Sequence, residues 1–255
     1  MKKLIKHIIS KMGYDVVRKK DNMLLISNHS LKPLLSDLFH KIMRYSDRPL
    51  NFLQIGAFDG YNNDLLWPYI VKYNWKGWAV EPHPDYHKKL AVNYSDYPGI
   101  ETSQYAINVD HKSLVFYTIS EKLFKLHPDA PHWLKQTSSY NLDVIMNSQR
   151  YLKFDLKPYI IEISVPCITL IDYILKEKIH SLDILAIDTE GYDYEILSSF
   201  PFTLLKPSII IYEHKHLSQS AYEDSINLLI DKNYLFYSSP TDTYAIDHDI
   251  YHFDN

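Results

Sequence analysis

Several acidic residues and glycines of this sequence stand directly after short apolar segments, where they could take part in chemistry. The segment NFLQIGAFDG leads from an apolar run into Gly56, Asp59 and Gly60. Gly56 lets the backbone approach a ligand closely because it has no Cβ atom, and Asp59 can accept hydrogen bonds from an ammonium or amide group. The alternative is a tight turn that caps the next helix, and this segment alone does not separate the two.

A second apolar segment, about 25 residues further on, ends at Glu81. If the two segments are neighbouring parallel strands, their carboxyl ends meet at one edge of a sheet, where α/β proteins bind ligands. Glu81 can then accept both hydroxyls of a ribose, and Tyr105 and Ala106 near the end of a third segment suit an adenine ring. These residues predict a ligand with an amine-bearing end, a ribose and an adenine, and they require no phosphate.

The known phosphate-binding loop patterns do not match this chain. The loop at Gly56 fits neither GxGxxG nor GxxxxGK[ST], and Asp59 would repel a pyrophosphate. None of the 22 tyrosines has a lysine four residues later, so the Tyr-x-x-x-Lys pair of short-chain dehydrogenases is missing from the sequence. An NAD-dependent oxidoreductase is therefore the less favoured alternative.

A second group of candidate residues lies in LDILAIDTEGYDYEIL and IIIYEHKH. Asp188 ends a buried strand, where an unpaired charge is costly, so it needs a ligand ammonium, a metal ion or a substrate hydroxyl as its partner. Glu190 follows it, and Glu213 and His214 end the next strand. These side chains can act as general bases. Asp188, Glu213 and His214 can also bind Mg²⁺ or another divalent ion, whereas the simpler alternative makes Glu213 and His214 rim residues of a loop.

Strands and helices alternate along most of the chain, which predicts an α/β fold. Strands that are almost entirely apolar indicate a parallel sheet with helices on both faces, and right-handed crossovers make it doubly wound. The last two strands have no helix between them, so one of them is antiparallel. The strands are expected at 50–55, 77–81, 100–107, 113–119, 163–168, 182–188, 208–214, 234–239 and 243–247.

We expect one large domain at 46–255 with an insertion at about 120–160 that contains one helix around 141–151. Residues 1–45 are expected to form an N-terminal helical extension, with a loop and one helix at 21–49. The first twenty residues carry seven of the 27 Lys and Arg and only one acid. An amphipathic helix there either contacts an anionic membrane surface or a partner, or packs on the domain with a solvated basic face.

Composition argues against several classes of function. A net charge of −4 argues against nucleic acid as a partner. Cys167 is the single cysteine, so neither an intrachain disulfide nor a cysteine metal cluster can form, which favours a reducing, cytoplasmic location. No apolar run reaches the roughly 18 residues of a membrane span. Contact with the inner face of a membrane would therefore rest on residues 1–20.

The segments FLQIGAFDGYNND, AVEPHP, LLKPSIIIYEH and above all LDILAIDTEGYDYEIL resemble the FkbM-type S-adenosylmethionine-dependent methyltransferases. The resemblance runs from about Asn51 to about Asp247 and implies the Rossmann-like seven-stranded methyltransferase sheet. It also implies S-adenosylmethionine as cofactor and O-methylation of a hydroxyl, often on a sugar. The family often has Asn in GANDG where this chain has Phe58, which should change the packing beside the cofactor.

The resemblance assigns roles to residues of this chain. It implies that the cofactor is bound by Gln54, Gly56, Ala57, Asp59, Gly60, Glu81, Pro82, Tyr105, Ala106 and Asp188. It places Asp188, Glu190, Glu213 and His214 on the substrate side as catalytic candidates, with their individual roles open.

The segment QTSSYNLD resembles a part of the insertion that can face the acceptor, so Ser138 and Ser139 are weaker candidates. Trp133 and Tyr140 could cover the site and stack on a sugar face, or they could belong to the core. The expected partner is a small-molecule or saccharide acceptor. The alternative to an active enzyme is an inactive cofactor-binding scaffold protein in a glycan-assembly complex.

Overall fold

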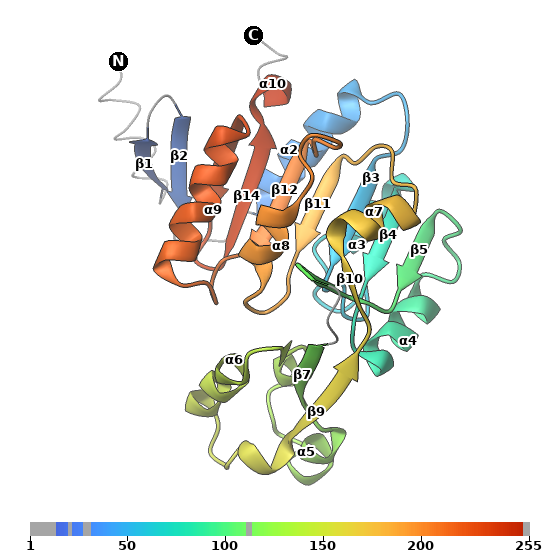
Figure 1. Ribbon diagram of the computed structural model, residues 1–255, viewed down its shortest axis with the longest axis vertical. Coiled ribbons are helices and arrows are strands. Elements are labelled where there is room, and N and C mark those ends of the chain that lie inside the picture. Colours follow the sequence, from blue (N-terminus) through green and yellow to red (C-terminus); the bar gives the residue numbers. More distant parts are fainter. Residues whose placement is uncertain (1–13, 20–21, 28–31, 111–113, 252–255) are drawn as a thin grey trace.

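Most of the predicted apolar segments are strands of one large sheet in the computed structural model, which describes residues 14–19, 22–27, 32–110 and 114–251. Seven strands of this sheet lie in the order β5-β4-β3-β11-β12-β14-β13, which is 3-2-1-4-5-7-6 along the chain (Figure 1). Their bounds are β3 Asn51–Ile55, β4 Lys76–Val80, β5 Ile100–Ser103, β11 Ile184–Ile187, β12 Ile209–Glu213, β13 Tyr234–Ser238 and β14 Asp242–Asp247.

The direction of each strand follows the sequence prediction. β3, β4, β5, β11 and β12 pair in parallel, whereas β14 is antiparallel to both β12 and β13. This confirms the predicted Rossmann-like methyltransferase sheet with an antiparallel last strand. The strand order reverses between β3 and β11, so the carboxyl ends of these two strands form the switch point where doubly wound sheets bind ligands.

Helices cover both faces of the sheet and enclose two separate hydrophobic cores (Figure 1). Phe52 of β3 packs with helices α2, α3 and α4, and its neighbour Leu53 packs with α7, α8 and α9 on the other face. This alternation is what a strand buried on both faces requires. The helices are α2 Lys32–Tyr45, α3 Trp67–Tyr73, α4 Pro84–Asn93, α7 Leu170–Lys176, α8 Asp193–Ser199 and α9 Gln219–Asp231, and a short α10 is His248–Tyr251.

A smaller unit lies below the main sheet in Figure 1. Its three antiparallel strands lie in the order β8-β7-β9 and have a core of their own around Leu134 and Ile145. β7, which the sequence predicts as a strand directly after the third one, thus belongs to this small sheet. The strands are β7 Leu114–Ile119, β8 Ser138–Ser139 and β9 Ile160–Val165. The helices of the unit are α5 Glu121–Leu126 and α6 Leu142–Asn147, with 3₁₀ turns at His132–Lys135, Ser148–Tyr151 and Lys157–Tyr159.

Two short strands connect this unit to the main sheet. β6 Ala106–Asn108 pairs in parallel with β10 Cys167–Thr169, so the chain leaves and re-enters the main domain through adjacent strands. The predicted third strand at 100–107 is accordingly split into β5 and β6.

The N-terminal region contains strands that the sequence analysis missed. β1 Tyr14–Lys19 and β2 Asn22–Ser27 form an antiparallel hairpin, and β2 pairs in parallel with β13, which extends the large sheet. The prediction of a loop at this point is therefore wrong for β2. The predicted amphipathic helix in the first twenty residues is wrong at Tyr14–Lys19, which form β1, and residues 1–13 lie outside the described residues. Within the described residues, no helix combines the length and apolar character needed to cross a bilayer.

Helix α2 fits the predicted helix and is part of the main core. Leu35, Leu38, Phe39 and Ile42 are buried against the sheet on the face that also carries α3. Four buried apolar side chains at i, i+3, i+4 and i+7 give the helix one apolar stripe. The separation of residues 1–45 from a domain at 46–255 stays a prediction, although α2 shares its core with the domain.

Gly56 allows the closest approach between β3 and β11. It has a φ of +81°, and a Cβ atom at this position would lie 1.7 Å from the carbonyl oxygen of Asp188. Its backbone N–H donates to the carbonyl of Val80 at 2.9 Å, so the same residue also joins β3 to β4. Only glycine satisfies both the conformation and the space.

We expect Gly56→Ala to lower the free energy of unfolding by at least about 2 kcal/mol, because the new methyl group must displace backbone and accept a left-handed conformation. Gly99→Ala is the matched control, since the nearest atom there is Lys76 Cγ at 3.0 Å, in a flexible side chain. Urea unfolding followed by circular dichroism measures both variants. Equal stability of the two variants would contradict this account of the strand contact.

Candidate active site

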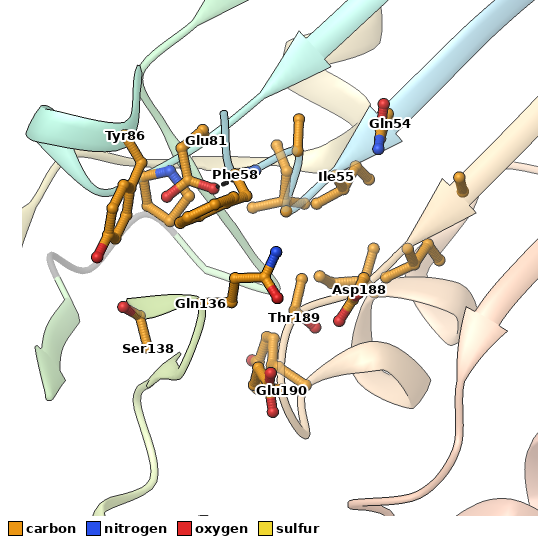
Figure 2. Close-up of a pocket in the computed structure, with 18 of the residues that line it drawn as sticks. Gln54, Ile55, Phe58, Glu81, Tyr86, Gln136, Ser138, Asp188, Thr189 and Glu190 are labelled. Atoms are coloured by element: carbon orange, nitrogen blue, oxygen red, sulfur yellow. Dashed lines mark hydrogen bonds between the residues drawn. The ribbon is translucent and has the colours of Figure 1, made fainter. Parts of the chain in front are cut away.

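A pocket of about 320 Å³ opens at the carboxyl ends of β3, β4 and β11 and is closed on one side by the small sheet. Figure 2 shows Glu81 on one side of this pocket and Asp188 on the other. The structure brings to its wall most of the residues that the sequence predicts for the site: Gln54, Gly56, Ala57, Glu81, Pro82, Tyr105, Ala106, Ser138, Asp188 and Glu190.

Glu81 follows β4 and is buried at the pocket wall. Its Oε2 accepts a hydrogen bond from the backbone N–H of Phe58 at 2.9 Å, and its Oε1 accepts one from the N–H of His83 at 2.8 Å. Burial raises the pKa of Glu81 to about 8, although these two N–H groups favour the charged form. Each carboxylate oxygen still has a lone pair for a further donor.

Asp59 and Gly60 do not line the pocket, unlike their predicted neighbours. The Asp59 carboxylate accepts hydrogen bonds from the backbone N–H groups of Tyr61 and Asn62 and from the Asn62 side chain. A Cβ atom on Gly60 would lie 2.5 Å from Leu90, so this glycine lets the loop pack under helix α4. In this structure both residues shape the loop, as the turn interpretation of the segment proposes.

Asp64 lines the pocket and was missed by the sequence analysis. Its Oδ1 accepts from the N–H groups of Leu66 and Trp67 at 2.7 Å each, and its Oδ2 accepts from Gln54 Nε2 at 2.7 Å. Burial raises its pKa. The signal in the sequence was an Asp shortly before an apolar helical segment with Pro68 in its first turn, which is typical of a helix start.

Asp188 stands at the switch point, where its N–H donates to the carbonyl of Ile55 at 2.9 Å. Its side chain lines the pocket and is accessible from it, but protein surrounds the pocket. The loss of bulk solvent around the carboxyl group raises its pKa well above the usual range, and the nearby charges of Glu213 and Glu190 raise it further. Asp193 behaves differently because it is fully buried and accepts from Thr189 Oγ1 at 3.0 Å. Asp193 therefore holds the loop, and Asp188 remains available to a ligand.

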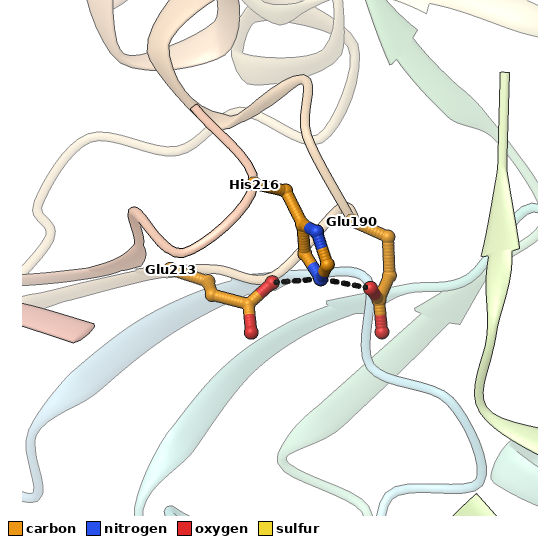
Figure 3. A group of neighbouring side chains, drawn as sticks. All are labelled: Glu190, Glu213 and His216. Atoms are coloured by element: carbon orange, nitrogen blue, oxygen red, sulfur yellow. Dashed lines mark ion pairs between the residues drawn. The ribbon is translucent and has the colours of Figure 1, made fainter. Parts of the chain in front are cut away.

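His216 takes the place that the sequence analysis gave to His214. The Nε2 atom of His216 lies 3.0 Å from Glu190 Oε2 and 3.7 Å from Glu213 Oε2 (Figure 3). His214 Nδ1 instead lies 2.9 Å from Thr243 Oγ1, and its ring packs on Tyr222. Neither Glu213 nor His214 lines the pocket. The strand ends at Glu213 and is followed by His214, Lys215 and His216, and strand periodicity alone does not tell which histidine points towards Glu190.

The smaller unit supplies the wall of the pocket opposite the main sheet. Gln136, Ser138 and Tyr140 line it there, and the Tyr140 ring contacts the Tyr192 ring at a centroid distance of 4.8 Å. Ser139 lies outside the pocket, and its hydroxyl donates to the Glu190 carbonyl at 2.8 Å. Trp133 is 40% exposed, packs against Tyr151, and does not reach the pocket.

Comparison with known proteins gives one family. The sequence profile described as the methyltransferase FkbM domain matches residues 54–236. No curated protein is significantly similar to the chain.

Solved structures with a similar fold include a putative caffeoyl-CoA O-methyltransferase from Staphylococcus aureus, at 10% identity and a TM-score of 0.44, covering 96% of this chain and 91% of that one. Another is a precorrin-6y C5,15-methyltransferase from Geobacter metallireducens, at 12% identity and a TM-score of 0.39, covering 84% and 87%. A third is a fibrillarin pre-rRNA processing protein from Methanococcus jannaschii, at 10% identity and a TM-score of 0.42, covering 92% of this chain and 83% of that one.

The raised pKa of Glu81 predicts a pH dependence of stability in the ligand-free protein. The unfolded carboxyl group ionises near pH 4.5, whereas the folded one keeps its proton up to about pH 8. The contribution of Glu81 to the free energy of unfolding is therefore complete below pH 4.5 and is lost as the pH rises through 8. We expect the fall in the free energy of unfolding between pH 5 and pH 8 to be about 1–3 kcal/mol smaller in Glu81→Gln than in the wild type.

Chemical unfolding at several pH values measures this slope, and Glu101→Gln is the control because Glu101 is exposed on the neighbouring strand β5. An unchanged slope in Glu81→Gln would show that this carboxyl group titrates normally in the folded protein.

Proposed function

The chain belongs to the FkbM methyltransferase family, and from this premise we propose that it transfers the methyl group of S-adenosylmethionine to a hydroxyl of a sugar or a related small molecule. The reaction class follows from the family, and the rest of the proposal is supported by the pocket. The pocket offers a carboxylate for a ribose, an aromatic and small-residue wall for an adenine, and acids on the opposite side for the acceptor.

The observation that supports cofactor binding best is the orientation of Glu81. Backbone N–H groups on either side fix its carboxylate, one on each oxygen, so the group cannot rotate away from the pocket. In its ionised form the carboxylate has one free lone pair on each oxygen, and two vicinal hydroxyls of a ribose match that pair of acceptors. Tyr105 and Ala106 also line the pocket.

The residues present fit the cofactor without any phosphate site. Gly56 places no side chain at the end of β3, so a ligand can approach the backbone there. Gln54 also lines the pocket, and its Nε2 donates a hydrogen bond to Asp64. When bound, S-adenosylmethionine supplies a methyl group that its sulfonium already activates. The protein then has to orient the acceptor hydroxyl, exclude water and remove one proton.

Asp188 is the residue that we propose as the proton acceptor. Its carboxylate faces the pocket and is not held by a hydrogen bond from the loop, in contrast to Asp193. A raised pKa makes this carboxylate a stronger base towards a hydroxyl than a solvated aspartate, because the ionised form holds a proton more tightly. Glu190 lines the same wall and is the second candidate for this role.

The acceptor is proposed to bind against the small sheet. Gln136 and Ser138 offer hydrogen-bond partners there, and Tyr140 offers a ring. Polar groups beside an aromatic face suit a polyhydroxylated ring, which presents hydroxyls at its edge and C–H groups on its faces. This supports a saccharide or related small molecule as the acceptor.

Cofactor binding is tested by calorimetric titration with S-adenosylhomocysteine. We expect the wild type to bind it and Glu81→Ala to bind it at least tenfold more weakly, a loss of about 1.4 kcal/mol or more, because the ribose hydroxyls lose their acceptors. Glu101→Ala should bind like the wild type. Parallel titration with NAD⁺ tests the oxidoreductase alternative, and binding of NAD⁺ in place of S-adenosylhomocysteine would overturn the proposal.

Catalysis is tested with Asp188→Asn. We expect this variant to keep the affinity for S-adenosylhomocysteine within threefold and to lose at least about 100-fold in the rate of methyl transfer, which is the usual effect of removing a general base. The rate is followed as S-adenosylhomocysteine formed from S-adenosylmethionine with a panel of mono- and oligosaccharides. An unchanged rate would exclude Asp188 as the base. Wild-type cofactor binding without turnover on any acceptor would favour the inactive scaffold.

A further inference from the structure

Glu190, Glu213 and His216 bring one histidine and two carboxylates together beside the cofactor pocket (Figure 3). We propose that these three side chains bind one divalent ion of the first transition series, with Mn²⁺ as the reference ion. The inference deepens the proposed function, on which its catalytic consequence rests. The ligand set differs from the one considered from the sequence, Asp188, Glu213 and His214, and shares only Glu213 with it.

The spacing of the three side chains fits a single ion. One ligand atom from each lies within 4.8 Å of the others. The His216 Nε2 atom is 3.0 Å from Glu190 Oε2 and 3.7 Å from Glu213 Oε2. Ligands that bind one metal ion at about 2.0–2.2 Å are separated from one another by roughly 3–4 Å. Small side-chain movements are therefore enough to complete the site.

A second and independent observation is that two of these atoms are buried without a hydrogen-bond partner. Within the described part of the chain, Glu213 Oε2 and His216 Nε2 are both inaccessible to solvent and make no aligned hydrogen bond, despite the short approach to Glu190. The side chains of Glu213 and His216 are only 13% and 15% exposed. Buried polar atoms without partners are uncommon and costly, and both atoms are aimed into the space between the three groups.

An ion pair with a protonated His216 explains the cluster less completely. The Nε2 atom carries one N–H at most, and this cannot serve Glu190 and Glu213 together. A metal ion accepts a lone pair from the imidazole and from both carboxylates at the same time. It would therefore give Glu213 Oε2 and His216 Nε2 a partner together with Glu190, whereas a single proton pairs His216 with one carboxylate at a time.

The surroundings of the cluster carry an excess of negative charge. Glu190, Glu213 and Asp242 all lie close enough to Asp188 to repel its charged form. Lys215 contributes one positive charge, at 3.8 Å from Glu213 Oε1. A divalent cation between Glu190 and Glu213 would offset the repulsion that these acids exert on one another.

The ligand types select the class of ion. Mg²⁺ favours sites made of oxygen ligands and water, whereas an imidazole together with carboxylates suits Mn²⁺, Fe²⁺, Co²⁺ or Zn²⁺. Three protein ligands leave further positions on such an ion for water or a substrate oxygen. Because Glu190 also lines the pocket, an ion here would adjoin the space that we assign to the acceptor and could lower the pKa of its hydroxyl.

The test is titration of the full chain, after treatment with a chelator and its removal, with Mn²⁺ followed by calorimetry and by electron paramagnetic resonance. We expect one Mn²⁺ per chain. His216→Gln and Glu213→Gln should each weaken binding at least tenfold, because each removes one ligand. His214→Gln is the matched control, since His214 lies two residues away and contacts Thr243 instead, and its affinity should stay within threefold of the wild type.

Titration of the same samples with S-adenosylhomocysteine separates this inference from the proposed function. Retained S-adenosylhomocysteine binding in His216→Gln and Glu213→Gln would show that these variants are folded. Mn²⁺ binding that is unchanged in both variants, or wild-type binding no tighter than millimolar, would overturn the metal site even if the cofactor binds. A wild-type protein that binds Mn²⁺ but not S-adenosylhomocysteine would instead overturn the proposed function and leave the metal site in place.

Discussion

The contact between the end of β3 and the end of β11 is the constraint on which the rest of the site depends. Gly56 lies so close to the Asp188 carbonyl that no side chain fits between them. Hydrogen bonds from Gly56 to Val80 and from Asp188 to Ile55 join three parallel strands at this point. Glu81 and Asp188 follow directly from the strands that are fixed in this way, so the two sides of the pocket are positioned by the backbone of the sheet.

The acids around the pocket fall into two groups according to what holds them. Asp59, Asp64 and Asp193 accept hydrogen bonds within their own loops, and these bonds offset the cost of their burial. Asp188 and Glu213 lack such partners on their pocket-facing or buried oxygens and repel each other. The first group stabilises the loops. In the second group the ionised carboxylates repel one another, and the burial of apolar side chains in the two hydrophobic cores must offset this cost in folding free energy. Residues of this second kind are the ones expected at functional sites.

The fold could be predicted from the sequence because the strands next to the switch point are short, apolar on both faces and separated by amphipathic helices. The N-terminal hairpin could not, since a strand at the edge of a sheet is defined by its pairing with β13, more than two hundred residues away. Within the site, Glu81 and Asp188 were found because each follows its strand directly. Asp64 and His216 were missed because loops, rather than strand periodicity, decide where they point.

The division of the pocket between two packed units has a consequence for specificity. The strand ends of the main sheet supply Glu81 and Asp188, whereas the smaller unit supplies Gln136 and Tyr140, on either side of β8, and is stabilised by a core of its own. The hydrogen bond from Ser139 to the Glu190 carbonyl ties the two units together at the acidic wall. Substitutions in the small sheet can therefore alter the surface offered to an acceptor without disturbing the strand contact at Gly56, provided that this tie is kept.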